Sequence, residues 1–279
     1  MQHRDSVLIS RRTALRIGAG IAAAGATGAA ALLLPSIVEA HGTLTTQSQI
    51  AGIPTYYDNN ASPTSFSYNP DFYNMLQQWW GFYYQNTPAT YVNPSLIRLL
   101  GVHVDGDPSS MHEYGRAADF YKVEMTYAPG GFQFVSFWAD HGAWQNDPQA
   151  NTYRLRYWGA VASLNYHFKY VLHYHYNAEH DNHVHVDNQA SGTGLSNFTT
   201  DSTSQVKFVQ ACCNYIFGLG TVIDGDFGPH SLADSDRVIA MAGGSGHITS
   251  SQQNWQLFCW AAMRVGHGLA IGGSCNGCQ

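Results

Sequence analysis

The stretch Ser110-Met-His112-Glu-Tyr-Gly115-Arg-Ala-Ala-Asp119 places an imidazole and a carboxylate seven residues apart. That spacing is too long for neighbours on one helical turn, so the chain must bend after His112 to bring Asp119 back beside it. Gly115 allows the bend, because glycine adopts a positive φ and leaves room for close backbone approach. Ala117 is small enough to pack beneath a bound ion. The stretch therefore predicts a loop that carries His112 and a strand that begins near Asp119.

A second histidine-rich segment, His180-Asp-Asn-His183-Val-His185, lies far downstream. In a strand, His183 and His185 point to the same side. Two imidazoles and one carboxylate can supply three protein ligands to one catalytic zinc ion, which leaves a position for water and a further histidine to move protons. His173-Tyr-His175 has the same spacing and stays an alternative pair.

Hydrophobic periodicity predicts an α+β fold, with a small antiparallel sheet and flanking helices that carry the zinc site. We expect helices over 71–84, 153–172, 206–216 and 250–265, and strands over 118–125, 132–138 and 183–186. Residues 95–100 fit a short helix or a strand. Residues 224–229 (DGDFGP) predict a turn.

The composition of the chain predicts a boundary between two domains. Residues 191–204 are rich in Gly, Ser and Thr and are typical of a linker between a catalytic domain at 41–190 and a small all-α domain at 205–279. The cysteines all fall in the later part: Cys212, Cys213, Cys259, Cys275 and Cys278. Outside the cell such residues favour disulfides over metal ligands, with the pairing left open.

The first 40 residues have the features of a twin-arginine export signal. Arg11 and Arg12 precede an Ala/Gly-rich apolar run, and Val38-Glu-Ala40 offers small residues for cleavage. The run is short and poor in Leu and Ile for a transmembrane helix. We therefore expect export to the periplasm, the cell wall or the medium, without stable membrane insertion after cleavage.

The mature chain is expected to be acidic. Removing residues 1–40 leaves nine basic and seventeen acidic residues, a formal charge of −8. This balance argues against nucleic acid, which requires a basic surface. Tyr, Trp, Asn, Ser and Thr are plentiful and suit contacts with a neutral polymer. We expect a monomer.

The first motif resembles the S-x-H-x-x-G-x-A-x-D signature of the zinc D-Ala-D-Ala peptidases, which cleave peptidoglycan. His180-x-x-His183-Val-His185 resembles the second motif of the His-x-His branch of that family. The resemblance covers about residues 70–190. It implies a zinc metallopeptidase, either a D,D-carboxypeptidase or an endopeptidase.

The same resemblance implies roles for individual residues. His112, Asp119 and His185 would bind zinc, and His183 would orient or deprotonate the water. His180 would assist proton transfer, and Glu179 would be an alternative base, because other branches use a glutamate just before the last ligand.

The chain departs from the family at one point. Many relatives carry a Gly-Tyr-Arg element upstream, whose arginine can hold a substrate carboxylate, and this chain has Leu99-Leu-Gly-Val-His-Val there. Arg98 and Arg116 are the nearby candidates for substrate binding, and either could be a plain surface charge. Ser110 is a candidate to bind substrate or a ligand side chain, or to cap a turn.

The tail resembles the peptidoglycan-binding type 1 domain, a three-helix module. The resemblance rests on Val206-Lys-Phe-Val-Gln210 and the 224–229 turn, and it implies that the tail holds the enzyme on the wall. A generic helical hairpin with an Asp-Gly turn would have the same pattern.

Two other functions fit parts of the sequence. Cleavage after Ala40 would expose His41 as an N-terminal histidine, as in copper polysaccharide oxygenases, but this would leave the His112, Asp119 and His185 set unexplained. The second alternative is a non-catalytic protein that binds the cell wall and has a vestigial zinc site.

Overall fold

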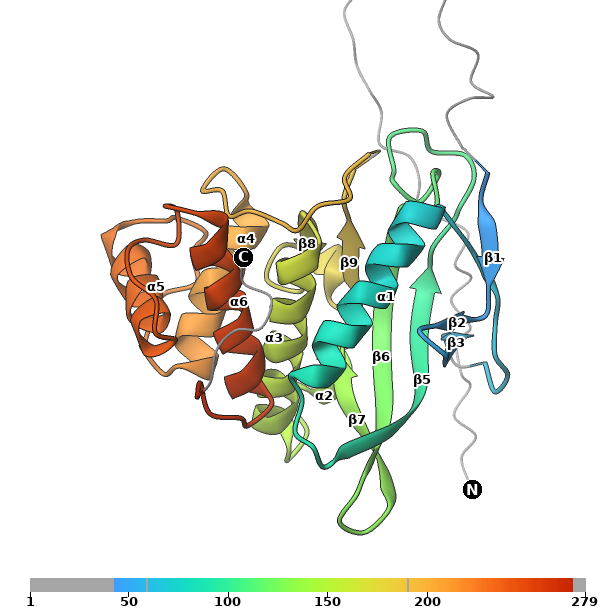
Figure 1. The fold of residues 1–279 in the computed structure, drawn as a ribbon, viewed down its shortest axis with the longest axis horizontal. Helices are drawn as coiled ribbons and strands as arrows, with labels where there is room; N and C mark the ends of the chain where they lie inside the picture. The colour runs from blue at the N-terminus through green and yellow to red at the C-terminus, as the bar shows by residue number, and fades with distance from the viewer. Residues whose placement is uncertain (1–42, 59, 190, 273–279) are drawn as a thin grey trace, which may run out of the picture. The chain divides into compact units, whose positions relative to one another are not determined.

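The chain folds into a mixed α/β structure with six α-helices in the part of the chain that is described (Figure 1). A computed structural model describes residues 43–58, 60–189 and 191–272. The predicted export signal, His41 and the cysteines at 275 and 278 lie outside these residues.

A seven-stranded sheet forms the framework of the site. Its order is β2-β3-β5-β6-β9-β8, and β7 pairs with β6 as well. The strands are β2 (Gln49–Ile50), β3 (Ile53–Tyr57), β5 (Tyr91–Gly101), β6 (Ala117–Tyr127), β7 (Phe132–Trp138), β8 (Tyr170–Leu172) and β9 (Val184–Asp187). The expected antiparallel pairing holds except between β3 and β5, which are parallel. A separate pair joins β1 (Thr45–Gln47) to β4 (Phe66–Tyr68).

Strand β6 is the centre of this sheet. One edge pairs with β5 along most of its length. The other edge is shared, because β9 pairs with residues 117–120 and β7 with residues 122–127. The two ends of β6 therefore have different neighbours.

Helices α1 (Pro70–Gln85) and α3 (Ala150–His167) pack against the sheet. Asn69 caps α1 by accepting from two backbone N–H groups, and Pro70 fits its first turn. Trp79 of α1 donates to the Ser163 hydroxyl of α3 at 2.9 Å, and its ring lies 4.8 Å from that of Phe120 in β6. Phe120 thus faces these helices, and Asp119 faces the opposite side of the sheet.

The predicted helix over 153–172 ends earlier than expected. Helix α3 stops at His167, and Tyr170–Leu172 forms strand β8 against β9. The Asn188 side chain accepts a hydrogen bond from the Lys169 backbone N–H just before this strand. Pairing with a distant strand therefore overrides the local helical pattern.

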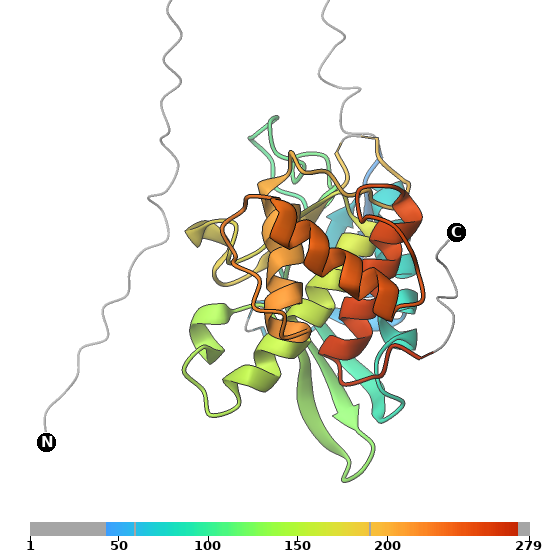
Figure 2. The same cartoon turned by 90° about the vertical axis from the view of Figure 1, so that its left-hand side faces the viewer.

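The remaining helices are α2 (His141–Trp144), α4 (Thr203–Ala211) with a π-helical continuation η3 (Cys212–Ile216), α5 (Pro229–Met241) and α6 (Gln252–Gly266). Of these, α4 and α6 pack beside α3, and α5 packs against α4 and α6 (Figure 2). Helix α5 was not expected. None of the helices in the described residues has the length and apolar run needed to cross a bilayer.

The C-terminal helices are joined closely to the sheet-bearing part. Gly159 of α3 and Gly266 of α6 touch, since a Cβ on Gly266 would lie 2.8 Å from the Gly159 Cα. In the predicted linker, Ser196 is buried and its hydroxyl accepts from the Trp255 indole at 2.6 Å. The domain boundaries stay a prediction.

The expected disulfides do not form among the described cysteines. Cys212, Cys213 and Cys259 are free thiols, and each is fully buried in the hydrophobic core. Here they act as small apolar side chains, and burial raises the pKa of each thiol.

Candidate metal centre

Three segments bring the predicted ligands together. His112 lies in the loop between β5 and β6, Asp119 lies near the start of β6, and His185 lies in β9. Asp119 and His185 are direct partners in the antiparallel register, so their side chains lie next to each other on the same face. The loop returns His112 to this pair.

Gly115 makes the return of this loop possible. Its φ is +61°, and a Cβ there would lie 2.9 Å from both the Asn69 backbone nitrogen and a Leu44 methyl group. Its carbonyl accepts a hydrogen bond from the same Asn69 N–H at 2.9 Å. The bend predicted at Gly115 is confirmed, because both the positive φ and the close approach exclude a side chain.

The three candidate ligand atoms form a tight triangle. Asp119 Oδ1 lies 2.9 Å from His185 Nδ1 and 3.3 Å from His112 Nε2. The two ring nitrogens lie 3.3 Å apart. Among the described residues these three form the one group whose spacing suits a metal ion.

This triangle matches the donor set of a tetrahedral ion. Ligand atoms about 2.0–2.2 Å from such an ion lie roughly 3.3–3.6 Å from one another. Two of the measured separations are 3.3 Å and the third is slightly shorter. Two imidazole nitrogens and one carboxylate oxygen also suit zinc chemically.

Hydrogen bonds fix which nitrogen of each histidine faces the triangle. His112 Nδ1 lies 2.6 Å from the Val102 carbonyl oxygen, to which it donates, so its Nε2 is left with a lone pair. His185 Nε2 donates to Asp187 Oδ2 at 3.0 Å, which frees Nδ1 in the same way. Such outer partners are typical of metal-binding histidines.

Asp187 was missed by the sequence reasoning. It follows His185 by two residues in β9, so it lies on the same face of the strand. The sequence argument that residues two apart in a strand share a face had already paired His183 with His185. Applied to the next such position, it would also have identified Asp187.

The electrostatics of the group favour a charged carboxylate. Burial alone would raise the pKa of Asp119, but hydrogen bonds from His112 and His185 lower it far below its usual range. Burial alone would lower the pKa of His185, yet Asp119 and Asp187 raise it to about 9, so without an ion Nδ1 carries a proton, which a bound ion would displace. A site that stabilises positive charge this strongly also favours a cation.

His183 and His180 lie beside the triangle rather than in it. His183 Nε2 is 3.8 Å from Asp119 Oδ1, and its Nδ1 lies 2.9 Å from the Asn182 side-chain oxygen. The His180 ring lies 4.9 Å from that of His183. Burial lowers the pKa of His183, and it lowers the pKa of His180 to about 4. Both rings are therefore neutral at pH 7.

The two arginines predicted to bind substrate already have other hydrogen-bond partners. Arg116 is buried and its guanidinium donates to the Gln189 and Gly192 carbonyls and the Asn69 side chain. Arg98 donates to the carbonyls of Asp58 and Asn60. These contacts indicate that both arginines hold loops in place.

Ser110 and Glu179 also lie apart from the ligand atoms. The Ser110 hydroxyl accepts from the His112 backbone N–H at 3.3 Å, which is the turn-capping role. Glu179 lies exposed in the short 3-10 helix η2 (Ala178–His180) and, among the described residues, does not belong to the group of His112, Asp119 and His185.

The alternative histidine pair lies elsewhere. His173 is buried and donates from Nε2 to the Ser204 carbonyl at 3.0 Å. The His175 ring lies 5.5 Å from that of Trp158 and 5.9 Å from that of Tyr215 and is nearly parallel to both. Neither belongs to the triangle, so of the two His-x-His pairs it is His185 that lies with His112 and Asp119.

Comparison of the chain with protein-family models, with curated proteins and with solved structures gave no match.

Proposed function

We propose that this chain is an exported zinc peptidase that cleaves amide bonds in the stem or cross-link peptides of peptidoglycan. The observation that supports it best is the triangle of His112 Nε2, Asp119 Oδ1 and His185 Nδ1, with separations of 2.9–3.3 Å. Each histidine has its other nitrogen already engaged as a donor, so an ion that displaces the proton on the inner nitrogen would find a lone pair there.

These three residues would hold one zinc ion. When bound, zinc polarises a carbonyl group and lowers the pKa of a water molecule. The set carries one negative charge, so the site keeps net positive charge toward a substrate carbonyl.

His183 is the residue that we assign to proton transfer. It is neutral at pH 7, because burial lowers its pKa. The Asn182 oxygen accepts from its Nδ1, so its Nε2 can accept a proton, and that atom lies 3.8 Å from Asp119 Oδ1. Proton transfer by a positioned base contributes about 10²–10⁴-fold to rate.

A substrate could extend along the neighbouring strand. A cavity of about 340 Å³ is lined by Leu172 and Tyr176 and by the segment 197–205. Leu172 is the register partner of His185, and the Tyr176 ring lies 5.9 Å from that of His180. Peptide flanking the scissile bond would fit in this position.

The occupied arginines favour endopeptidase action over carboxypeptidase action. A carboxypeptidase needs a cation for the free C-terminal carboxylate. Arg98 and Arg116 are the two candidates of the sequence, and backbone carbonyls hold both. A substrate without a terminal carboxylate at the cleaved bond suits this site better.

The tail supports a wall-binding role. The Gln210 side chain donates to Asp224 Oδ1 at 2.8 Å and to the Asp226 carbonyl at 2.9 Å, and it accepts from Gly225 N–H at 2.9 Å. The glutamine of the first helix therefore fixes the DGDFGP turn, which joins the two motifs of the peptidoglycan-binding resemblance.

The test is to incubate the purified protein with defined cross-linked and linear muropeptides and to identify the products by mass spectrometry. We expect cleavage of cross-linked dimers, loss of cleavage with a chelator, and recovery with Zn²⁺. His183→Ala should lower the rate at least about 100-fold, whereas His230→Ala, an exposed histidine of the tail, should not change it.

Three results would contradict the proposal. Wild-type rates in His183→Ala would exclude its proton-transfer role. Binding to the wall without release of any fragment would indicate a non-catalytic protein. Stoichiometric copper instead of zinc in the purified chain would favour the oxygenase, whose His41 lies outside the described residues.

A further inference from the structure

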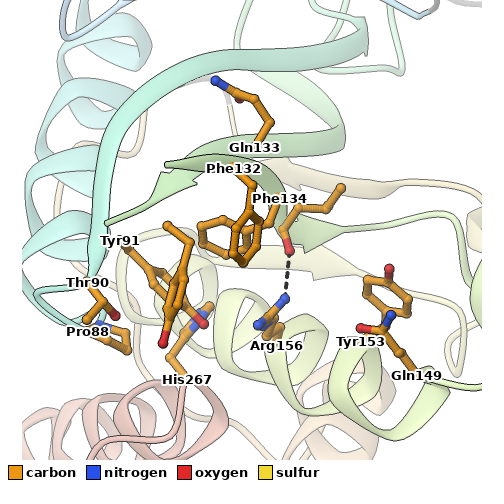
Figure 3. Close-up of a pocket in the computed structure, with 12 residues that line it drawn as sticks. Pro88, Thr90, Tyr91, Phe132, Gln133, Phe134, Gln149, Tyr153, Arg156 and His267 are labelled. Atoms are coloured by element: carbon orange, nitrogen blue, oxygen red, sulfur yellow. Dashed lines mark hydrogen bonds between the residues drawn. The ribbon is translucent and has the colours of Figure 1, made fainter. Parts of the chain in front are cut away.

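A large cavity lies at the end of β6 remote from the metal centre (Figure 3). Its volume is about 730 Å³, and it is bounded by the start of β5, the β6–β7 hairpin, helix α3 and the residue after α6. Asp119 and Tyr127 are eight residues apart along β6, which is about 26 Å at the rise of a strand. A ligand here would therefore be separate from the bond cleaved at the metal centre.

His267 is the unusual residue of this cavity. Its side chain is 4% exposed, and neither ring nitrogen has a hydrogen-bond partner among the described residues. The edges of the Tyr83 and Tyr91 rings surround it at 5.4 and 6.0 Å. Buried polar atoms are rarely left unpaired, so the two unpartnered nitrogens, which have almost no exposed surface, are an unusual feature of this cavity wall.

The imidazole can both donate and accept. Burial, with a smaller contribution from Arg156, lowers the pKa of His267 to about 3. The ring is therefore neutral at pH 7, with one N–H donor and one lone pair. A hydroxyl or an amide group can satisfy both kinds of contact.

Arg156 supplies the charge of the cavity. It is the charged side chain of the lining, and in the described part of the chain it has no carboxylate partner. It donates to the Val135 carbonyl at 3.2 Å, and its guanidinium lies 5.1 Å from the centre of the Phe134 ring and 5.7 Å from that of Tyr91. A guanidinium has five N–H donors, so it can also bind a carboxylate.

The walls combine flat rings with neutral polar groups. Tyr91 and Phe134 pack edge to face with centroids 4.6 Å apart, and the neighbouring Phe132 is 55% exposed. Gln149 lies at one side of the hollow in Figure 3, whereas the Gln133 amide points away from it and is held by Ser95 and Thr126. Aromatic faces suit a ring that has an apolar face.

From this arrangement we propose that the cavity binds an acidic saccharide, with the sugar ring against the aromatic walls and the carboxylate on Arg156, beside the buried ring of His267. The volume falls within the range of roughly 300–1,000 Å³ that is typical of small-molecule sites. A peptide would match the Arg156 charge but would use the flat aromatic walls less fully. The inference does not depend on the metal centre.

The test is to titrate the full chain with the disaccharide of N-acetylglucosamine and N-acetylmuramic acid, which carries a free carboxylate, by calorimetry. The neutral disaccharide of N-acetylglucosamine should bind at least about tenfold more weakly, because it leaves Arg156 unpaired. Saturation should also shift the imidazole ¹⁵N resonances of His267, a change that a general effect on stability would not produce.

Substitutions of Arg156 test whether the saccharide binds in this cavity. Arg156→Gln should weaken binding of the acidic disaccharide about tenfold or more, and Arg156→Lys should restore part of it. Arg154→Gln is the matched control: it removes the same charge from the same helix, but Arg154 packs over Tyr215 outside the cavity. It should bind as the wild type does, and thermal unfolding confirms that each variant is folded.

Several outcomes would overturn the inference. These are absence of saccharide binding at millimolar concentration, equal binding of the neutral and acidic disaccharides, an unchanged affinity in Arg156→Gln, or an equal loss in Arg154→Gln. Preferential binding of an acidic peptide would replace the saccharide by a different class of ligand.

Discussion

Asp187 orients the ring of His185: its Oδ2 accepts from Nε2 at 3.0 Å, while Nδ1 of the same ring lies 2.9 Å from Asp119 Oδ1. Removing the charge of Asp187 should weaken the orientation and the basicity of His185. We expect Asp187→Asn to lower zinc affinity about 10–100-fold, as measured by competition with a chromogenic chelator. Asp201→Asn, an exposed carboxylate in the tail, serves as the control and should bind zinc normally. An unchanged affinity in Asp187→Asn would show that His185 does not depend on this partner.

The loop that carries His112 should be sensitive at Gly115. A Cβ there meets the Asn69 backbone nitrogen at 2.9 Å, so Gly115→Ala should displace the loop and lower both zinc affinity and stability. We expect a loss of about 1–3 kcal/mol in the free energy of unfolding, the usual range for overpacking and strained φ. Urea unfolding and the chelator assay measure the two effects.

Gly106→Ala is a control that separates the effect of backbone strain from that of steric contact. Gly106 lies in the same loop with a φ of +109°, but nothing lies within 4 Å of a Cβ built there. Gly106→Ala should therefore carry backbone strain without moving His112. Equal losses of zinc affinity in the two variants would contradict the role that we assign to the close approach at Gly115.

The sequence predicts a helix or strand well when the residues of that element alone determine it. The aromatic spacing of residues 71–84 and the run FQFVSFW predict α1 and β7 well. In each segment the spacing of the apolar residues already marks the face that becomes buried. The end of α3 and strand β8 depend on pairing with β9, which no local pattern reveals. Helix α5 was missed too, since two of its buried residues are Ser231 and Ser235, which give no apolar signal.

The group of His112, Asp119 and His185 was predicted residue by residue, as were its neighbours His183 and His180, whereas Asp187 was not. His112, Asp119 and His185 stand out because ligand chemistry restricts residue type and spacing. The arginines illustrate the limit of this reasoning. A charge near a motif suggests substrate binding, but only the tertiary structure shows that backbone carbonyls already hold Arg116.

Buried neutral histidines should make the protein sensitive to acid. Burial lowers the pKa of His173 to about 3 and that of His167 to about 4. Below about pH 6.5 the unfolded chain binds a proton on each residue that the folded chain does not bind, so the free energy of unfolding falls as the pH falls. Each histidine contributes a slope of about 1.4 kcal/mol per pH unit between its two pKa values.

The measurement is urea unfolding between pH 4.5 and 6. His173→Gln should be less stable at pH 7, where its hydrogen bond to Ser204 is altered, and its stability should decline less steeply with acid. His247→Gln is the control, because that residue is 56% exposed in its side chain and should leave the slope almost unchanged. A slope that His173→Gln does not reduce would mean that this residue is not the neutral, buried group described here.

The contact between α3 and α6 should be intolerant of a single methyl group. A Cβ on Gly266 would lie 2.7 Å from the Leu155 carbonyl oxygen and 2.8 Å from the Gly159 Cα, and both are backbone atoms that cannot turn aside. We expect Gly266→Ala to lower the free energy of unfolding by about 1–3 kcal/mol. Gly81→Ala in α1 is the matched control, because nothing lies within 4 Å of its Cβ and alanine favours a helix by about 0.5–1 kcal/mol. Since Gly266 precedes His267, the first variant should also weaken saccharide binding in the remote cavity. A Gly266→Ala protein as stable as the wild type would show that the two helices are not packed this closely.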